Sequence, residues 1–181
     1  MVVAFLDARY GGSLQRMFGA PTGQLREELL ALKGVGPETA DSILLYAGHH
    51  EVFVVDAYAR RILERHEAIA NTAKYDDIRL LVESALRRER TVALAGAANR
   101  PIAHEPSPMS TAERSQLAQV YNEMHGLLVQ AGKHYCHKRV AQCESCPLRG
   151  LLSAAQRARL QSLEPMRPAV RTKSTGKPLR E

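Results

Sequence analysis

The sequence has few aromatic residues, no long apolar run and no recognisable targeting signal. Phenylalanine, tyrosine and tryptophan make up 5% of its 181 residues, whereas hydrophobic residues as a whole make up 45%. No apolar stretch approaches the roughly 20 residues that a membrane-spanning helix needs. The amino-terminal residues MVVAFLDARYGG also lack the basic region and cleavage site of a signal peptide. The composition therefore predicts a soluble, helix-rich, cytoplasmic protein without membrane partners, built as one domain or two small lobes.

The net charge of +6 is concentrated towards the carboxyl end of the sequence. Residues 153–181 contain seven basic and two acidic residues, so they carry +5, and the first 152 residues carry only +1. A nearly neutral body gives little support for a basic nucleic-acid-binding face. Because residues 153–181 also contain three prolines and few large apolar residues, we expect a disordered basic tail. Such a tail would add salt-sensitive phosphate contacts or only increase solubility.

Hydrophobic residues recur at helical spacing along most of the chain, which predicts an all-α fold. One helix is expected after Pro21 with Thr22 as its N-cap, and a second is expected to begin at Pro37. Between these helices and residue 152 we expect an extended apolar run, a helix from about 76 to 88 with Leu81 inward, and a long helix. The predicted domains are a remnant of a helical lobe (1–47, with a helix-hairpin-helix at 25–47), a second helical lobe (48–152) and the tail (153–181).

A capping box is predicted at the start of the long helix. Ser110 and Glu113 match the spacing at which two side chains satisfy each other's backbone donors. The preceding residues 95–109 are rich in alanine, glycine and proline, which indicates a connection between helices. We therefore expect the long helix to open at Ser110.

Two glycines bracket the turn in LKGVGPETAD, residues 32–41. The structural interpretation is a helical hairpin whose glycines only permit the turn. The functional interpretation is a helix-hairpin-helix, in which the glycines let the backbone approach a nucleic-acid strand and free N–H groups face a phosphate. Such a contact holds DNA without reading its sequence. The candidate phosphate-binding residues are Gly34, Val35, Gly36 and Thr39.

The spacing from this hairpin to Asp56 favours the functional interpretation. The hairpin, followed by an extended apolar run and VVDAYARR, resembles the helix-hairpin-helix DNA glycosylases of the endonuclease III superfamily. The resemblance implies that the hairpin holds double-stranded DNA containing a damaged base, and that Asp56 carries the chemistry. Asp56 also precedes a helical segment, so we expect one carboxylate oxygen to cap that helix while the carboxylate faces the pocket.

Three cysteines follow with the spacing C-x6-C-x2-C; they are Cys136, Cys143 and Cys146. From the residues alone they are zinc ligands, cluster ligands or isolated thiols. The resemblance implies the [4Fe–4S] loop of the superfamily, but its fourth cysteine is replaced by Leu152, which cannot ligate iron. Four outcomes stay open: a cluster with three thiolates, a site completed by His134 or His137, a zinc site, and a loop that has lost its metal.

Glu38 departs from the bifunctional members of the superfamily. Those members have a lysine at the matching position, whose amine forms a Schiff base with the sugar, and a carboxylate cannot form that imine. The resemblance therefore implies a monofunctional glycosylase without an efficient lyase step, with Glu38 near the flipped base or a water molecule. The alternative is that Glu38 is only a favourable acid in the first turn of its helix.

Within the superfamily the sequence is most similar to the branch typified by 3-methyladenine DNA glycosylase III, which implies an alkylated base. The damaged nucleotide would leave the base stack. Ionised Asp56 would then stabilise the positive charge that develops on the sugar and orient the attacking water. A pocket lysine of that branch has no match here, where Leu127 or a neighbour stands, so the identity of the base stays open.

About 24 residues precede the first hairpin helix, whereas several helices precede it in the superfamily. A fragment, a misplaced start codon and a degenerate protein are the three interpretations, and exposed apolar faces on the hairpin helices are expected. Two other functions are therefore considered: a non-catalytic helix-hairpin-helix DNA-binding module and a metal-stabilised interaction protein. The enzyme itself is expected to be a monomer associated with the nucleoid.

Overall fold

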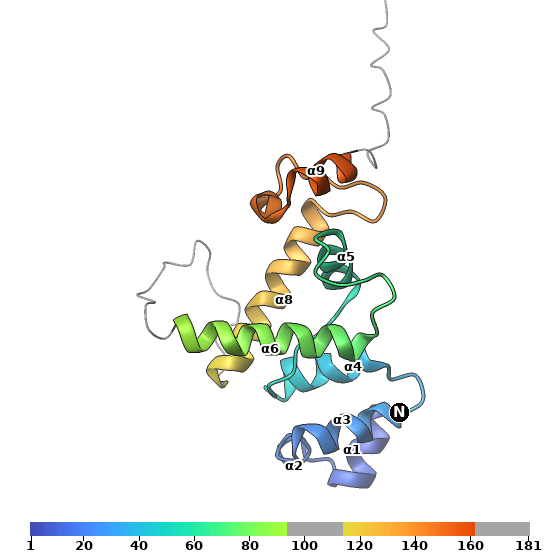
Figure 1. The fold of residues 1–181 in the computed structure, drawn as a ribbon. Coiled ribbons are helices and arrows are strands. Elements are labelled where there is room, and N and C mark those ends of the chain that lie inside the picture. The colour runs from blue at the N-terminus through green and yellow to red at the C-terminus, as the bar shows by residue number, and fades with distance from the viewer. Residues whose placement is uncertain (94–113, 162–181) are drawn as a thin grey trace, which may run out of the picture.

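The computed structural model describes residues 1–93 and 114–161, and within them the regular structure is helical (Figure 1). The only β-type pairing in these ranges is one isolated bridge between Cys136 and Ala141. The predicted all-α fold is therefore confirmed. The elements are α1 (Val2–Tyr10), α2 (Leu14–Phe18), α3 (Thr22–Leu30), α4 (Pro37–Ser42), η1 (Ile43–Ala47), α5 (Ala57–Arg65), α6 (Tyr75–Ala93), α8 (Gln116–His134), η2 (Pro147–Leu151) and α9 (Ala154–Gln161).

Helices α3 and α4 form the predicted hairpin. The turn between them places Gly34 at φ +86°, and the N–H of Val35 donates to the carbonyl of Leu32 at 3.0 Å. Helix α4 begins at Pro37 and continues into η1, a π-helical turn. The predicted N-cap was wrong: Thr22 is the first residue of α3, because its hydroxyl is hydrogen-bonded to the ring of His50 at 2.8 Å instead of capping the helix.

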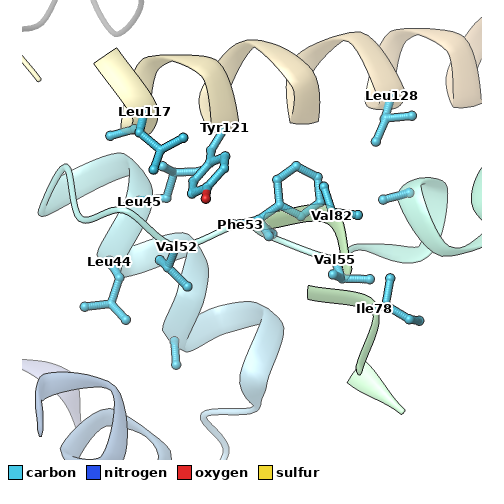
Figure 2. Packing of buried hydrophobic residues seen from close by; sticks show 14 of the residues in the cluster. Leu44, Leu45, Val52, Phe53, Val55, Ile78, Val82, Leu117, Tyr121 and Leu128 are labelled. Atoms are coloured by element: carbon cyan, nitrogen blue, oxygen red, sulfur yellow. The ribbon is translucent and has the colours of Figure 1, made fainter. Parts of the chain in front are cut away.

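Residues 52–55 run extended through the centre of the molecule and lead directly to Asp56. All four side chains are buried, and the ring of Phe53 packs edge-on against Tyr121 of α8, with 6.1 Å between ring centroids. Figure 2 shows this segment between α8 on one side and η1 and α6 on the others. The predicted extended apolar run is confirmed, and its burial fixes the position at which α5 starts.

Helices α6 and α8 enclose that segment. Ile78 and Val82 of α6 are buried, but Leu81 is 45% exposed, so the predicted inward position of Leu81 was wrong. Helix α8 begins at Gln116 after Ser115, whose hydroxyl accepts from the N–H of Ala118 at 3.1 Å. The helix therefore starts later than predicted, and the proposed capping box at 110–113 lies outside the described residues.

Arg26 forms a buried ion pair within the hairpin and a second ion pair with α6. Arg26 of α3 donates to Asp41 of α4 at 2.6 Å, and the Asp41 side chain is completely buried. The same guanidinium reaches Asp76 of α6 at 2.7 Å. The relative position of α3, α4 and α6 is thus set by directional contacts as well as by apolar packing.

The polar contacts continue from α6 to the extended segment. Arg79 pairs with Glu83 at 3.0 Å, and Glu83 accepts a hydrogen bond from the N–H of Phe53 at 2.9 Å. The hydroxyl of Tyr75 accepts from the N–H of Val55 at 3.2 Å. These contacts satisfy backbone donors that no sheet partner satisfies, which is necessary because the segment is buried.

The carboxyl-terminal part of the described chain is more ordered than predicted. Residues 154–161 form α9, and Ser153 and Gln156 cap it reciprocally, with N–H to side-chain distances of 2.7 and 3.2 Å. Leu160 is buried against Leu152. The predicted disordered tail was therefore wrong for residues 153–161, because Leu160 has an apolar cluster to enter. Residues 162–181 lie outside the described part.

Helices α1 and α2 cover one side of the hairpin (Figure 1). Arg9 of α1 pairs with Glu28 of α3 at 3.1 Å, and Met17 of α2 is buried in the main core. The expected exposed apolar faces on the hairpin helices were wrong, because the large exposed hydrophobic residues of this region belong to the first two helices and include Val3 and Leu14. None of the helices in the described ranges combines the length and apolar character needed to cross a membrane.

Candidate functional site

Asp56 lies at the junction of the extended segment and α5. Its Oδ1 accepts a hydrogen bond from the N–H of Ala59 at 2.7 Å, and its backbone is extended, as an N-cap requires. The predicted capping role is therefore confirmed. The side chain is 14% exposed, so the carboxylate is largely removed from water.

The second oxygen of Asp56 faces a histidine that the sequence analysis did not select. His125 of α8 places Nε2 3.6 Å from Oδ2 of Asp56, and the His125 side chain is 10% exposed. The other ring nitrogen, Nδ1, pairs with the hydroxyl of Tyr46 in η1. The signal that would have identified His125 is its place in the apolar stripe of α8, between buried Tyr121 and Leu128.

The electrostatics of these residues favour an ionised carboxylate. Burial alone would raise the pKa of Asp56, but the interaction with His125 and the N–H groups of Ala59 and Tyr58 outweighs burial and lowers it. Burial, and then the negative charge of Asp56, raise the pKa of Tyr46 to about 12, against the opposing charge of Arg114. At neutral pH, Asp56 is therefore charged and Tyr46 keeps its proton.

The predicted phosphate-binding residues lie in the turn before α4 and, for Thr39, in the first turn of α4. Gly34, Gly36 and Thr39 are exposed, and within the described residues their N–H groups donate to no other atom. The N–H of Val35 is used inside the turn, so Val35 offers no free donor. Three of the four predicted residues thus have exposed backbone donors without a partner among the described residues.

Among the described residues, nothing that surrounds Gly36 requires a glycine there. Its φ of −92° is open to any residue, and a Cβ built on it would meet nothing within 4 Å. Gly34 differs, because its φ of +86° disfavours any other residue. The surface at Gly36 is therefore open in the described part of the chain.

Glu38 lies on the exposed side of the same helix turn. Within the described ranges it makes no hydrogen bond or ion pair, and none joins it to Asp56. Two residues further on, Ala40 and Asp41 are fully buried. The turn therefore presents Glu38 and Thr39 outward and uses the next two residues to hold the hairpin in place.

The three cysteines line one small cavity. Cys136, Cys143 and Cys146 surround it together with Leu152 and Leu160. Its volume is about 20 Å³, which is close to the minimum that holds one water molecule.

A guanidinium and a buried leucine complete the surroundings of the thiols. Arg65 of α5 donates to the sulfur of Cys136 at 3.1 Å. Leu152 stands at the position of the expected fourth thiolate and is 5% exposed.

These residues do not fit a four-thiolate cluster. Leu152 is buried as part of an apolar cluster with Ala141, Cys143 and Leu160. Nowhere in residues 1–93 and 114–161 do three histidine, cysteine, aspartate or glutamate side chains converge as a metal ion would require. His134, one suggested fourth ligand, is instead hydrogen-bonded to Gln130 at 3.1 Å.

Comparison with known proteins agrees with the geometry of the hairpin. Residues 25–46 match the model of the helix-hairpin-helix motif. The chain therefore contains a helix-hairpin-helix motif. The motif comprises most of α3, the glycine turn, α4 and nearly all of η1, and therefore includes the proposed phosphate-binding surface.

Two curated relatives extend the similarity beyond the motif. The chain is 38% identical over 125 residues to a protein of Methanocaldococcus jannaschii described as a "putative DNA repair glycosylase". It is 25% identical over 126 residues to an endonuclease III of Sulfolobus acidocaldarius. The matches cover 69% and 70% of this chain but 44% and 43% of the relatives. The helix-hairpin-helix chain thus spans less than half the length of these relatives.

Proposed function

We propose that this chain belongs to a base-excision-repair DNA glycosylase, in which it supplies the DNA-contacting hairpin and the catalytic carboxylate. The observation that carries the proposal is Asp56: a carboxylate kept ionised, largely shielded from water, and rigidly connected to a helix-hairpin-helix. Similarity to a protein described as a DNA repair glycosylase and to an endonuclease III supports the same function.

The proposed reaction is hydrolysis of the N-glycosidic bond of a damaged base. As this bond breaks, positive charge develops on the sugar, and a nearby fixed carboxylate stabilises that charge without reorganising. Oδ1 of Asp56 is held by the N–H of Ala59, so Oδ2 is the oxygen available to the sugar or to the attacking water. The low pKa of Asp56 keeps this oxygen charged at neutral pH.

The hairpin would hold the phosphate backbone of double-stranded DNA. Gly34, Gly36 and Thr39 present free N–H groups on one exposed turn, and such groups at the start of a helix suit a phosphate. Gly36 permits the close approach, because a side chain there would project into open space that the DNA would occupy. This contact positions the duplex and carries no sequence information.

Glu38 supports a monofunctional reaction. It lies exposed in the first turn of α4, and a carboxylate cannot form the Schiff base through which a lysine would cleave the strand. We infer that the enzyme releases the base and leaves an abasic site. Glu38 would then contact the flipped base or a water molecule.

An alkylated base is the proposed substrate, because a cationic purine is already a good leaving group. Leu127 or a neighbour on α8 stands where the similar glycosylase branch has a pocket lysine, and Leu127 is 68% exposed, two residues beyond His125. We infer a monomer that acts at the nucleoid.

The cysteine loop is proposed to fold without a [4Fe–4S] cluster. The buried leucine at the fourth position and the small cavity support this proposal. In place of an iron–sulfur cluster, the loop would be held by the apolar cluster around Leu160 and by the hydrogen bond from Arg65 to Cys136. Neither iron nor zinc enters the proposed reaction.

Assays on defined duplexes would test the function. Duplexes that contain 3-methyladenine, uracil or mispaired thymine are incubated with the protein and divided into portions treated with and without alkali. We expect free base and strand breaks that require alkali, with 3-methyladenine released fastest. Tight duplex binding without release of any base would instead indicate a non-catalytic DNA-binding module, and absence of both would favour an interaction protein.

A further inference from the structure

One buried polar atom near Asp56 lacks a hydrogen-bond partner. Among the described residues, Nε2 of His125 makes no hydrogen bond, although the atom is shielded from water. It lies 3.6 Å from Oδ2 of Asp56, slightly beyond hydrogen-bond distance. A buried polar nitrogen without a partner costs free energy, so its position facing a carboxylate calls for an explanation.

The contact of the other ring nitrogen indicates where the proton lies. Tyr46 keeps its hydroxyl proton and can donate it to Nδ1 of His125. When Nδ1 accepts this proton, the ring carries its own hydrogen on Nε2, facing Asp56. The opposite tautomer would direct a lone pair of Nε2 at the carboxylate, which is repulsive. In the favourable arrangement, Nε2 is therefore a donor aimed at an acceptor.

We propose that Tyr46 and His125 act together as positioning residues for Asp56: the tyrosine sets the histidine tautomer, and the histidine N–H fixes the oxygen that faces the sugar. This inference rests on the glycosylase function proposed above. The gap of 3.6 Å closes to a hydrogen bond when substrate occupies the site, as contacts in unoccupied active sites often do. Neither residue touches the reacting atoms.

The fold brings the three residues together from separate elements. Tyr46 belongs to the π-helical turn η1, His125 to α8 and Asp56 to the start of α5. Isolated π-helical turns are frequent at functional sites. Phe53 packs against the His125 ring, with 6.3 Å between ring centroids.

Close packing of α5 on α8 sets the distance between His125 and Asp56. A Cβ on Gly132, two helical turns beyond His125, would lie 2.4 Å from the ring of Tyr58. No real Cβ tolerates that contact, so only glycine allows the two helices to approach this closely here. The approach brings the start of α5, and hence Asp56, within reach of α8.

The test compares variants of the histidine and the tyrosine. His125→Ala removes the donor and Tyr46→Phe removes the group that sets the tautomer, whereas His125→Gln keeps an N–H donor of similar reach. Glu123→Ala, an exposed position on the same helix, serves as the control. Duplex dissociation constant, single-turnover rate of base release and thermal unfolding are measured for each variant.

We expect His125→Ala to lower the rate about 10- to 100-fold, as loss of a hydrogen bond to a charged group implies, with duplex affinity unchanged. Tyr46→Phe should give a smaller loss, His125→Gln should restore part of the rate, and the control should match the parent. The positioning role is wrong if His125→Gln is as slow as His125→Ala, since a residue that only fills space gives that result.

A second readout does not need activity. The groups that face Asp56 are His125, Tyr46 and the N–H groups of Ala59 and Tyr58, and Arg114 acts on Tyr46. NMR titration of the Asp56 carboxyl carbon should show a higher pKa in His125→Ala than in the parent. An unchanged pKa together with an unchanged rate would overturn the inference and leave the glycosylase function intact. A raised pKa in a chain that releases no base would overturn the proposed function and retain the positioning contact.

Discussion

At Asp56 a single carboxylate serves the fold and the proposed chemistry through different oxygens. Oδ1 accepts from the N–H of Ala59, and Oδ2 faces His125. An N-cap is worth about 0.5–2 kcal/mol, so the residue contributes to stability even where no substrate is present. Substitutions that keep the cap and remove the charge therefore separate the two roles.

The pH dependence of base release follows from the lowered pKa of Asp56. The reaction needs the carboxylate, which loses its charge only as the pH falls through a value below the ordinary 3.8. We expect single-turnover rates to show no acidic decline from pH 8 down to about pH 5, well above that pKa. A decline centred above about pH 5 would show that Asp56 is not the group that must be ionised.

The absence of a Schiff base is the prediction for Glu38. When the protein is incubated with damaged duplex in the presence of borohydride, no covalent protein–DNA adduct should be trapped, because Glu38 offers no amine. A bifunctional glycosylase on the same duplex serves as the positive control. A trapped adduct, or strand cleavage without alkali, would contradict the monofunctional reaction.

At the scale of elements, the hairpin owes its DNA-facing surface to two glycines with different roles. Gly34 is required by its backbone conformation, whereas Gly36 is free of intramolecular constraint. Changing Gly36 to alanine should therefore weaken DNA binding without loss of stability, whereas changing Gly34 to alanine should lower the stability of the fold.

Gly36→Ala should weaken duplex binding about five- to tenfold, equivalent to one hydrogen bond, with thermal stability unchanged or slightly raised. For Gly34→Ala the free energy of unfolding should also fall by about 1 kcal/mol, because alanine is strained at φ +86°. Gly23→Ala is the matched control, since its Cβ also meets nothing within 4 Å and it lies at the start of α3. If Gly36→Ala and Gly23→Ala bind the duplex equally well, the hairpin does not contact the DNA.

The buried pair Arg26–Asp41 should account for much of the rigidity of the hairpin. Asp41→Ala removes the 2.6 Å partner of Arg26 and leaves the half-exposed Asp76 as its remaining partner, so the free energy of unfolding should fall by about 1–3 kcal/mol, the cost of losing a hydrogen bond to a charged group. Denaturant unfolding measures the loss, and Glu27→Ala, exposed on the same helix as Arg26, should change stability by less than about 0.5 kcal/mol. A loss of stability below about 1 kcal/mol for Asp41→Ala would mean that water solvates the guanidinium of Arg26 in the variant.

The sequence correctly predicted the features that are determined by neighbouring residues. The hairpin, the extended run before Asp56 and the N-cap at Asp56 each depend on residues close together in the chain. The contact of Tyr46 with His125 joins residues 79 positions apart, and no periodicity reports such a pair. Thr22 shows a second limit: its hydroxyl satisfies His50 rather than its own helix, a tertiary contact that overrides a local preference.

The carboxyl-terminal helix was missed for a similar reason. Composition alone predicted a disordered tail, but the Ser153–Gln156 capping box is a local signal that was present in the sequence. What could not be predicted was the apolar cluster that receives Leu160. Its other members lie around the cysteine loop, and they include Leu152, which stands where the family resemblance implies a fourth thiolate.

At the scale of the whole molecule, the long helix α8 connects the core beside the hairpin with the cysteine loop. Helix α8 contacts the main core near its start and ends beside the cysteine loop (Figure 1). The chain spans less than half the length of the relatives it matches, so the activity of a complete protein is a proposal here.

Iron content provides a test of the cysteine loop. Protein purified without oxygen should contain no stoichiometric iron and no visible iron–sulfur absorbance, and it should unfold at the same temperature with or without a chelator. Leu152→Cys, which restores the fourth thiol, is the informative comparison because it should acquire iron if the loop still has the right shape. Stoichiometric iron in the parent would show that three thiolates suffice.

The most direct measurement is single-turnover release of free base from a duplex containing 3-methyladenine, by the parent chain and by Asp56→Asn. Asparagine is as good an N-cap as aspartate, so the fold should be kept, and duplex affinity and unfolding temperature verify this. Asp7→Asn, exposed on α1, is the control. We predict that Asp56→Asn abolishes release while duplex affinity stays within twofold. Release at an unchanged rate would contradict the assignment of the catalytic carboxylate.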